Sequence, residues 1–489
     1  MFEHFLSNPD LFSEQAYVDG HWLSAVNGHT IDVFNPATGA LIGTVPDCGR
    51  DTTRIAIEAA EKALVDWRTK TAVYRASLIE KWYDLILNNI HDLGLILTVE
   101  QGKPITEAKA EIKYAASFVK WFAEEGRRIS GYDIASPEVS RRIMVMKEPV
   151  GVCAAITPWN FPAAMITRKC APALAAGCAV VVKPSELTPY TALALAKLAE
   201  KAGIPSGVFN VVTGLPVEIG EEITSNPIVR KLSFTGSTNI GSLLMEQSAK
   251  TVKRLSLELG GNAPLIVFDD ADLDLAIEGA IASKFRNAGQ TCVCANRILV
   301  QDGIYDEFAN RLEKAVSKFK IGDGQNENVT IGPLINAAAV NKVQDHIDDA
   351  IALGGTLMSL STPDDMDKNK FIAPAVIRNA TLDMRCAHEE TFGPLAPLFR
   401  FKDEGEALRI ANDTRYGLAS YFYTENMHRA WRVAEKLEAG MVALNTGSLA
   451  MEMAPFGGVK SSGLGREGGA AGIEEYLELK AFHIAGLKP

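Results

Sequence analysis

A regular alternation of short apolar segments and helical patterns limits this chain to few architectures. The segments VGVCAAITP, GCAVVVKP, GVFNVVTG and VRKLSFTG start at about 150, 177, 207 and 229. Each is rich in β-branched residues and ends in a turn with Pro or Gly, and helical patterns such as TALALAKLAEKAG lie between them. This spacing predicts βαβ units around a parallel sheet. In such sheets ligands bind at the carboxyl ends of the strands.

Other regions extend this pattern. Residues 15–46 are typical of short strands with turns, and residues 51–125 of amphipathic helices. A second strand–helix alternation begins at LELGGNAPLIVF and continues past residue 400. With 489 residues the chain is long enough for about three domains, so we predict an α/β protein of several domains.

Charge and cysteine content narrow the class of protein. Lys and Arg number 49 against 60 Asp and Glu, and the net charge of −11 disfavours general binding to nucleic acid or anionic membranes. Seven cysteines form too sparse a set for a disulfide framework and favour a reducing compartment. No signal-peptide pattern and no apolar stretch of about 18 residues is visible. We therefore expect a cytoplasmic protein with no nucleic-acid or membrane partner.

The Gly-rich segment near the end of the chain is a misleading motif. Gly463-Leu-Gly465-Arg-Glu-Gly468 matches a dinucleotide-binding pattern, but no apolar strand leads into it and only 21 residues follow. We interpret it as a close-packed loop. Gly236 in SFTGSTNIG is better placed, after a strand and before a helix whose N–H groups can bind phosphate, although an ordinary βα turn explains it equally well.

Cys292 is the strongest candidate nucleophile. It follows a helical pattern in the polar turn GQTC, where a thiol is accessible, although a loop cysteine without a task is an equally simple interpretation. A zinc site is disfavoured because the available spacings are Cys-x-Cys and Cys-x-His, so we predict no metal. The residues weighed for that site are Cys292, Cys294, Cys386 and His388.

Two polar residues at other strand ends strengthen this interpretation. Glu258 ends the segment LE of LELGG, and Asn160 lies between two prolines in PWNFP. A thiol, a carboxylate and an amide at strand ends match a nucleophile, a base and an oxyanion donor.

Together these motifs resemble the aldehyde dehydrogenase superfamily. The matching pieces, in the family's order, are PWNFP (158–162), KPSE (183–186), FTGS (234–237), LELGG (257–261), GQTC (289–292), EETFGP (389–394) and PFGG (455–458). The resemblance implies a Rossmann-like NAD-binding domain, a catalytic α/β domain and a small β-rich oligomerisation element that makes dimers or tetramers. The implied boundaries are 1–125 and 147–256, 257–440, and 126–146 with 470–489, respectively.

The resemblance also implies a mechanism and a cofactor. The Cys292 thiolate would attack the aldehyde, Asn160 and the Cys292 N–H would hold the oxyanion, and Glu258 would activate the water that hydrolyses a thioester. We expect NAD to be preferred over NADP, because a carboxylate at Glu186 accepts hydrogen bonds from ribose hydroxyls but repels a 2′-phosphate. The implied cofactor residues are Trp159, Asn160, Lys183, Ser185, Glu186, Phe234, Gly236, Ser237, Leu259, Glu390 and Phe392.

Two arginines point to a substrate with a carboxylate tail. Arg168 lies in the apolar segment AAMITRKCAPALAAG, and Arg286 lies six residues before Cys292. An Arg grips a carboxylate bidentately, whereas a solvated surface residue is the simpler alternative for any Arg. Both positions resemble those of succinate-semialdehyde dehydrogenases, so we predict oxidation of succinate semialdehyde to succinate.

The chain departs from that pattern at Ala450, where the similar enzymes have a carboxylate-binding Ser. A lost donor costs about 1–3 kcal/mol if its partner stays unpaired. Ser448 or Thr446 would compensate, or the tail would differ, as in glutarate semialdehyde. Phe456 of PFGG completes the implied substrate site.

Cys294 lies two residues from the candidate nucleophile, as in similar enzymes with a reversible disulfide there, so it is a candidate redox residue.

The main alternative to a dehydrogenase is a cofactor-free thiol esterase or acyltransferase. Such an enzyme would keep Cys292 and Glu258 but would have no use for Lys183, Glu186 or Glu390. A non-catalytic protein of the same fold would be expected to have lost Cys292 or Glu258.

Overall fold

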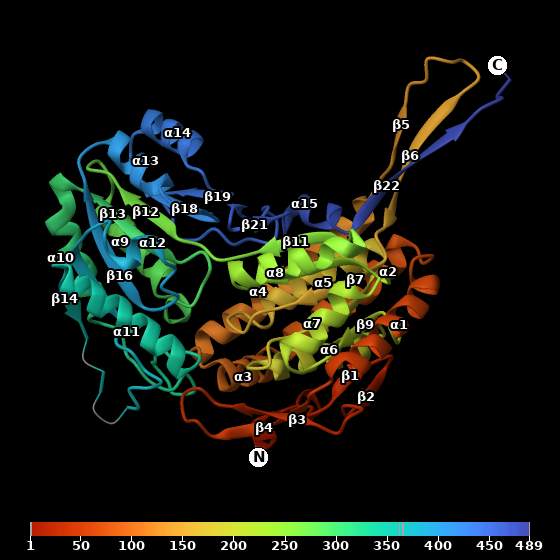
Figure 1. Ribbon diagram of the computed structural model, residues 1–489, viewed down its shortest axis with the longest axis horizontal. Helices are drawn as coiled ribbons and strands as arrows, with labels where there is room; N and C mark the ends of the chain where they lie inside the picture. The colour runs from red at the N-terminus through yellow and green to blue at the C-terminus, as the bar shows by residue number, and fades with distance from the viewer. Residues whose placement is uncertain (1, 361, 364–365, 489) are drawn as a thin grey trace.

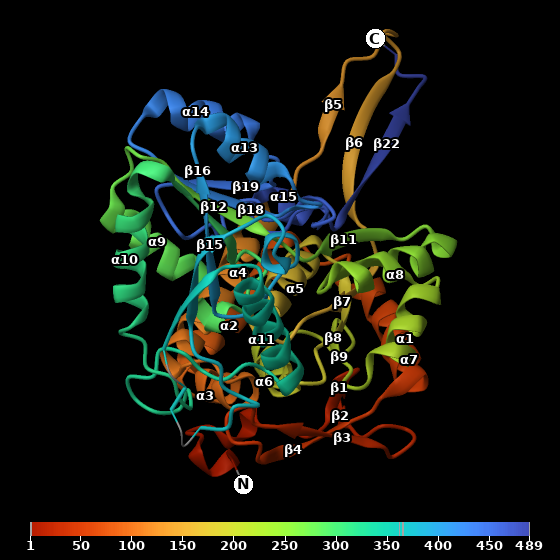
Figure 2. The same ribbon diagram turned by 60° about the vertical axis from the view of Figure 1, so that its left-hand side comes forward.

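The computed structural model describes residues 2–360, 362–363 and 366–488. Met1, Ser361, Asp364, Asp365 and Pro489, which fall in the predicted domain ranges, lie outside the described residues. Two large sheets form separate lobes, and a third sheet projects from the molecule beside the C-terminus (Figures 1 and 2). The predicted α/β class is confirmed.

The first sheet has eight strands, and its five central strands are parallel. Its order is β2 (His21–Leu23), β1 (Ala16–Val18), β9 (Phe209–Val211), β8 (Ala179–Lys183), β7 (Val152–Ile156), β10 (Val229–Thr235), β11 (Arg254–Glu258) and β21 (Gly463–Leu464). Both faces are covered, which explains the continuous apolar runs in its sequence. Cys153 and Ala155 pack into one core, whereas Val152 and Ala154 pack into another on the opposite face.

Helices cover both faces of this sheet. One core is formed with α2 (Ala72–Asn88), α3 (Ile90–Gln101), α4 (Ile105–Glu125), α5 (Ala164–Ala176) and α6 (Pro189–Ala202). The other is formed with α1 (Gly49–Trp67), α7 (Pro216–Ser225) and α8 (Thr238–Ser248). The amphipathic pattern predicted over residues 51–125 is therefore α1 to α4, and it packs on the first sheet.

The second sheet forms the other lobe. Its order is β14 (Thr356–Ser359), β15 (Ala375–Ala380), β16 (Leu395–Phe401), β13 (Ala295–Gln301), β12 (Ala263–Val267), β18 (Ala419–Tyr423) and β19 (Met441–Leu444). Its helices are α9 (Leu273–Lys284), α10 (Tyr305–Val316), α11 (Ala337–Ala352), α12 (Arg385–His388), α13 (Glu404–Asn412) and α14 (Met427–Lys436). Because β19 lies beyond residue 440 and β21 returns to the first sheet, the chain crosses between the lobes near its end.

The projecting sheet joins distant parts of the sequence. Its order is β22 (Leu477–Ile484), β6 (Arg142–Pro149) and β5 (Tyr132–Ile134), and β22 follows α15 (Gly469–Glu474). Two small pairs complete the fold: β3 (Thr30–Phe34) with β4 (Leu41–Pro46), and β17 (Tyr416–Gly417) with β20 (Val459–Lys460). Strands β6 and β22, which lie more than 300 residues apart in the sequence, are thus neighbours in one sheet (Figure 1).

Candidate active site

The parallel strands of the first sheet deliver polar residues to one edge. From β7 the chain moves outward through β8 and β9, then returns to the other side of β7 with β10 and β11. The order therefore reverses between β7 and β10, the place where ligands bind in open α/β sheets. Asn160 follows β7, Lys183 ends β8, Ser237 follows β10, and Glu258 ends β11.

The loop that carries Cys292 is held in an unusual backbone conformation. A short 3-10 turn spans Arg286–Gly289, and within it Asn287 and Ala288 have φ of 52° and 54°. Gly289 follows at φ 75°, where a Cβ would lie 2.2 Å from the Gly393 carbonyl oxygen. Left-handed residues other than Gly are strained, so the surroundings must hold them.

Hydrogen bonds from the other lobe hold that loop. The Asn287 N–H donates to Glu107 Oε2 at 2.8 Å, and the Asn287 amide donates to the Asn160 carbonyl at 3.0 Å. In return, the Asn160 amide donates to the Gln290 carbonyl at 2.9 Å. The candidate oxyanion donor and the nucleophile loop therefore position each other.

Cys292 is partly exposed at a cavity of about 290 Å³ between the lobes. The sequence-predicted residues that line this cavity are Trp159, Asn160, Gly236, Ser237, Leu259, Cys292, Glu390 and Phe392. The Trp159 and Phe392 rings meet edge to face, with centroids 5.6 Å apart. Tertiary folding thus gathers eight predicted residues from both lobes.

The other predicted cofactor residues do not line this cavity. Lys183 is buried and its Nζ lies 2.8 Å from Glu186 Oε2, so these two side chains pair with each other. Ser185 Oγ accepts a hydrogen bond from the Leu187 N–H at 3.2 Å. The Phe234 ring packs under Gly236, where a Cβ would lie 2.4 Å from it.

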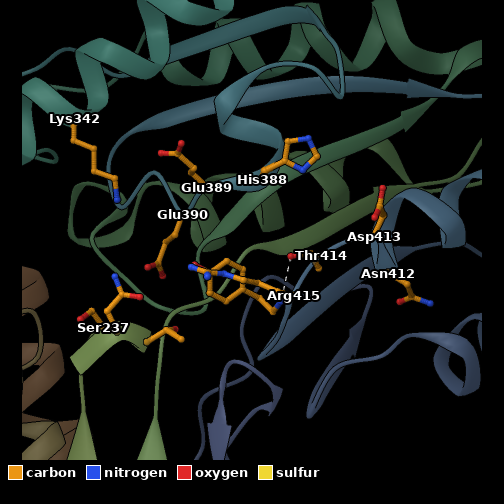
Figure 3. Close-up of a pocket in the computed structure, with 12 residues that line it drawn as sticks. Ser237, Lys342, His388, Glu389, Glu390, Asn412, Asp413, Thr414 and Arg415 are labelled. Carbon is orange, nitrogen blue, oxygen red and sulfur yellow. Dashed lines mark hydrogen bonds between the residues drawn. The ribbon is translucent and has the colours of Figure 1, made fainter. Parts of the chain in front are cut away.

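A second, larger cavity of about 810 Å³ adjoins the first. The two share Ser237, Lys342 and Glu390. Figure 3 shows Glu390 extending toward Ser237, whereas Glu389 extends away from it. The Glu390 carboxylate accepts a hydrogen bond from the Gly261 N–H at 3.0 Å, and burial raises its pKa to about 7.

The electrostatics favour a neutral thiol in this state of the protein. Burial raises the pKa of Cys292 to about 12, and the negative charges of Glu390 and Glu258 act in the same direction. Glu258 is 2% exposed, and its carboxylate oxygens have no hydrogen-bond partner among the described residues. Burial, followed by the charge of Glu467, raises the pKa of Glu258 well above its usual value. A buried carboxyl with a raised pKa is suited to general-base work.

Sequence reasoning missed a buried charged cluster beside Glu258. Lys169 Nζ pairs with Glu467 Oε1 and lies 2.6 Å from Thr235 Oγ1, while Arg168 Nε lies 2.7 Å from Glu467 Oε2. The two cations hold the pKa of Glu467 below its usual value despite burial. Two features of the sequence could have indicated this cluster: Lys169 directly follows Arg168 in an apolar segment, and Glu467 is an acidic residue within the Gly-rich segment.

The two predicted substrate arginines have different surroundings. Arg168 is 1% exposed, paired with Glu467, and stacked between the rings of Phe118 and Phe456, at 5.1 Å and 4.0 Å from their centroids. Its charge is therefore already compensated inside the protein. Arg168 Nη2 has no hydrogen-bond partner among the described residues, and a role for Arg168 in binding the substrate carboxylate stays a prediction.

Arg286, in contrast, is exposed and has no ion pair among the described residues. It lines a cavity of about 360 Å³ together with Ser448, and its guanidinium lies 5.2 Å from the Phe161 ring. Phe161 also lines the cavity of Cys292, so the Arg286 guanidinium lies next to one wall of that cavity. Ala450 is half-buried and does not line either cavity.

Cys294 is buried, and its thiol donates to the Lys284 carbonyl at 3.4 Å. Both Cys292 and Cys294 are free thiols here.

Within the described residues no three His, Cys, Asp or Glu side chains gather as a metal site would require. No helix in the described part of the chain combines the length and apolar character needed to cross a bilayer.

Comparisons with known proteins agree with this geometry. The profile of the Aldehyde dehydrogenase family matches residues 22–482. The chain is 58% identical to a succinate-semialdehyde dehydrogenase of Escherichia coli strain K12, named for NADP(+), over 98% of this chain and 99% of that one. It is 59% identical to a glutarate-semialdehyde dehydrogenase of Pseudomonas putida, over 98% and 99%.

A solved structure of a succinate-semialdehyde dehydrogenase from Burkholderia pseudomallei is similar throughout. It superposes with a TM-score of 0.97 at 59% identity and covers 98% of this chain and 100% of that one. The family profile covers most of the sequence, and these relatives match it over nearly its full length. The chain belongs to the aldehyde dehydrogenase family.

Proposed function

We propose that this protein is a cytoplasmic, NAD(P)-dependent dehydrogenase of semialdehydes that carry a carboxylate tail. Succinate semialdehyde is the proposed substrate and glutarate semialdehyde the alternative, because relatives named for both are 58–59% identical to this chain. The observation that carries the proposal is Arg286, an exposed cation without an ion pair among the described residues, located beside the cavity of Cys292.

The proposed chemistry assigns one task to each of three residues. Cys292 Sγ, once deprotonated, attacks the aldehyde carbon, and the oxyanion forms near the Asn160 amide and the Cys292 N–H. After oxidation of this adduct a thioester remains on Cys292. Glu258 takes a proton from the attacking water and returns it to the leaving sulfur, which releases the carboxylic acid and restores the thiol.

The residues present fit a dinucleotide cofactor. The first cavity lies at the switch point of the sheet, beside the N-terminus of the 11-residue helix α8, which Ser237 caps. Glu390 extends toward Ser237 and would offer its carboxylate to the ribose hydroxyls of a bound cofactor (Figure 3). When bound, NAD or NADP supplies the acceptor for the hydride that leaves the adduct.

The preference for NAD rests on Glu186. Its carboxylate lies at the end of β8 and is only partly exposed, with Lys183 as its partner. A 2′-phosphate placed there would meet this carboxylate, although Lys183 would offset part of the repulsion. We therefore expect a higher kcat/KM with NAD than with NADP, and equal values would contradict the preference.

The tail of the substrate is assigned to the cavity of Arg286. Ser448 lines that cavity and supplies a hydroxyl in the region where Ala450 lacks one. A guanidinium with a nearby hydroxyl can bind a carboxylate through two or more hydrogen bonds.

The test is a panel of succinate, glutarate, aliphatic and aromatic aldehydes, each assayed with NAD and with NADP. Arg286→Met is expected to raise KM for carboxylated aldehydes by about 10- to 100-fold, the loss of a charge-assisted hydrogen bond of about 1.5–3 kcal/mol. Uncharged aldehydes should be unaffected, and Arg54→Met on the surface of α1 is the control. No preference for carboxylated aldehydes would refute the assignment. Cleavage of esters by Cys292 without any turnover of aldehydes with cofactor would favour the thiol esterase instead.

The projecting sheet is proposed to join copies of the chain as dimers or tetramers. Met144 and Phe482 face each other across β6 and β22 and are 41% and 48% exposed. Apolar side chains exposed on a projecting sheet are typical of contact surfaces.

A further inference from the structure

Helix α11 places one buried histidine against the segment that carries Glu390 and Phe392. His346 is fully buried. Its Nδ1 lies 3.1 Å from Thr391 Oγ1, and its Nε2 lies 3.2 Å from Glu389 Oε2. These two partners are the residues immediately before and after Glu390. A single imidazole therefore holds both neighbours of a residue that lines both cavities.

The hydrogen bonds determine which form of the ring fits. An ionised carboxylate only accepts, so Nε2–H donates to Glu389, and Nδ1 is left to accept from the Thr391 hydroxyl. The neutral ring thus satisfies both of its nitrogens. Burial lowers the pKa of His346 and outweighs the opposing charge of Glu389, while Lys342 and Arg385 act in the same direction as burial.

The segment has few other side-chain anchors. Asn296 fixes its backbone, because its amide donates to the Glu389 carbonyl at 2.9 Å and accepts from the Thr391 N–H at 3.1 Å. Arg385 holds the Glu389 carboxylate at 3.2 and 3.1 Å. From the side of α11, His346 is the residue that ties the two flanking side chains together.

The backbone at Phe392 is strained, so the hydrogen bonds of His346 to the same segment affect the orientation of Phe392. Phe392 has a φ of 56°, an uncommon conformation for a bulky residue and one that persists only when its surroundings impose it. Its ring meets Trp159 across the first cavity. Release of Thr391 would let Phe392 relax and would let the Glu390 carboxylate turn away from the Gly261 N–H.

From this geometry we infer that His346 is a positioning residue for the cofactor site. It lines neither cavity, and it acts by holding Glu390 and Phe392 in the orientation that the cofactor would meet. The inference rests on the proposed function, because the cofactor roles of Glu390 and Phe392 are part of that proposal.

The test compares four variants of the full-length protein for direct binding of NAD, by calorimetry or tryptophan fluorescence. His346→Leu keeps most of the volume but removes both hydrogen bonds, and it should weaken NAD binding about 10-fold, as expected for about 1.4 kcal/mol. His346→Gln retains a donor and an acceptor and should restore binding to within about three-fold. Glu389→Ala, at an exposed site, removes one of the two tethers and should give an intermediate loss.

The control is Ile347→Ala, the next residue on α11, which is buried but makes none of these hydrogen bonds. It should lower the thermal midpoint while leaving the dissociation constant of NAD unchanged. In steady-state assays His346→Leu should raise KM for the cofactor more than it lowers kcat.

Failure of the positioning role of His346 and failure of the proposed function give different results. If His346→Leu and Glu389→Ala bind NAD as tightly as the unmodified protein, His346 has only a structural role and the inference is wrong. If the unmodified protein binds neither NAD nor NADP, the proposed function itself fails. If His346→Leu does not fold, Glu389→Ala still decides the question.

Discussion

At the scale of single residues, Glu258 and its neighbours show how burial sets chemistry. Strand β11 carries the carboxylate into the interior, where it has no hydrogen-bond partner among the described residues. Glu467 lies close enough for its charge to raise the pKa of Glu258, while Arg168 and Lys169 oppose that effect. The position of Glu258 at the end of a strand was predicted from the sequence, whereas the charges around it come from α5 and the Gly-rich segment.

Glu467→Gln should shift the acid limb of the pH–rate profile. Glu258 works as a base only when ionised, so thioester hydrolysis slows as the pH falls through its raised pKa. Removal of the Glu467 charge also leaves Arg168 and Lys169 without a partner, and both changes lower the pKa of Glu258. The limb should therefore move to lower pH, by about one unit for a nearby charge. The measurement is kcat against pH, with Glu258→Gln as the reference that lacks the limb. A limb that stays in place or moves upward would show that Glu467 does not act on Glu258.

Arg168→Met should lower the free energy of unfolding of the protein, and its effect should not be limited to substrate affinity. The substitution leaves Glu467 facing Lys169 only, and loss of one partner from a buried ion pair costs about 3–5 kcal/mol. Chemical denaturation should reveal this cost, whereas Arg286→Met, at an exposed site, should unfold almost as the unmodified protein does. An Arg168→Met protein with full stability but a raised KM for carboxylated aldehydes alone would restore the role predicted from the sequence.

At the scale of elements, the Gly-rich segment closes the first sheet. β21 pairs with the end of β11, so that Gly463 lies opposite Glu258. Gly463 has a φ of 145°, and a Cβ there would lie 2.0 Å from the Leu257 carbonyl oxygen. The segment packs closely, as predicted, but Gly463 and Leu464 form strand β21 and not a loop. The motif resembles a phosphate-binding turn because both need glycines for close approach of backbones, but here the approaching group is a strand.

Gly463→Ala should destabilise the protein and displace Glu258. The added methyl group collides with backbone, and the strained backbone alone costs on the order of 1–3 kcal/mol. The midpoint temperature of thermal unfolding and kcat should both fall. Gly303→Ala is the matched control, because a Cβ at Gly303 meets nothing within 4 Å. Equal behaviour of the two variants would mean that β21 does not support the site.

At the scale of the whole molecule, the candidate active site draws residues from both lobes. Asn160 comes from the first lobe and Cys292 from the second, and their loops hold each other by hydrogen bonds. The projecting sheet is the remaining large-scale feature (Figure 1). It carries the exposed apolar pair Met144 and Phe482.

Substitution of that pair tests the proposed oligomer. The variant with Met144→Lys and Phe482→Lys places two cations on a surface that we expect to meet a second copy, so its molar mass by light scattering should fall by half or more. His483→Gln, on the opposite face of β22, should leave the mass unchanged. An unaltered mass in the doubly substituted protein would assign the contact to another surface.

The sequence by itself determined the parallel sheet, the strand-end turns and the residue types suited to acyl chemistry, because hydrophobic periodicity and turn residues act over short distances along the chain. Cys292, Glu258 and Asn160 could be selected for that reason. Only the tertiary structure decided what each charge faces. Arg168 became an internal ion pair and Arg286 stayed exposed, although both are arginines near the same loops. Burial and pairing depend on segments hundreds of residues apart, such as α5 and Glu467, and no local pattern encodes which of them meet.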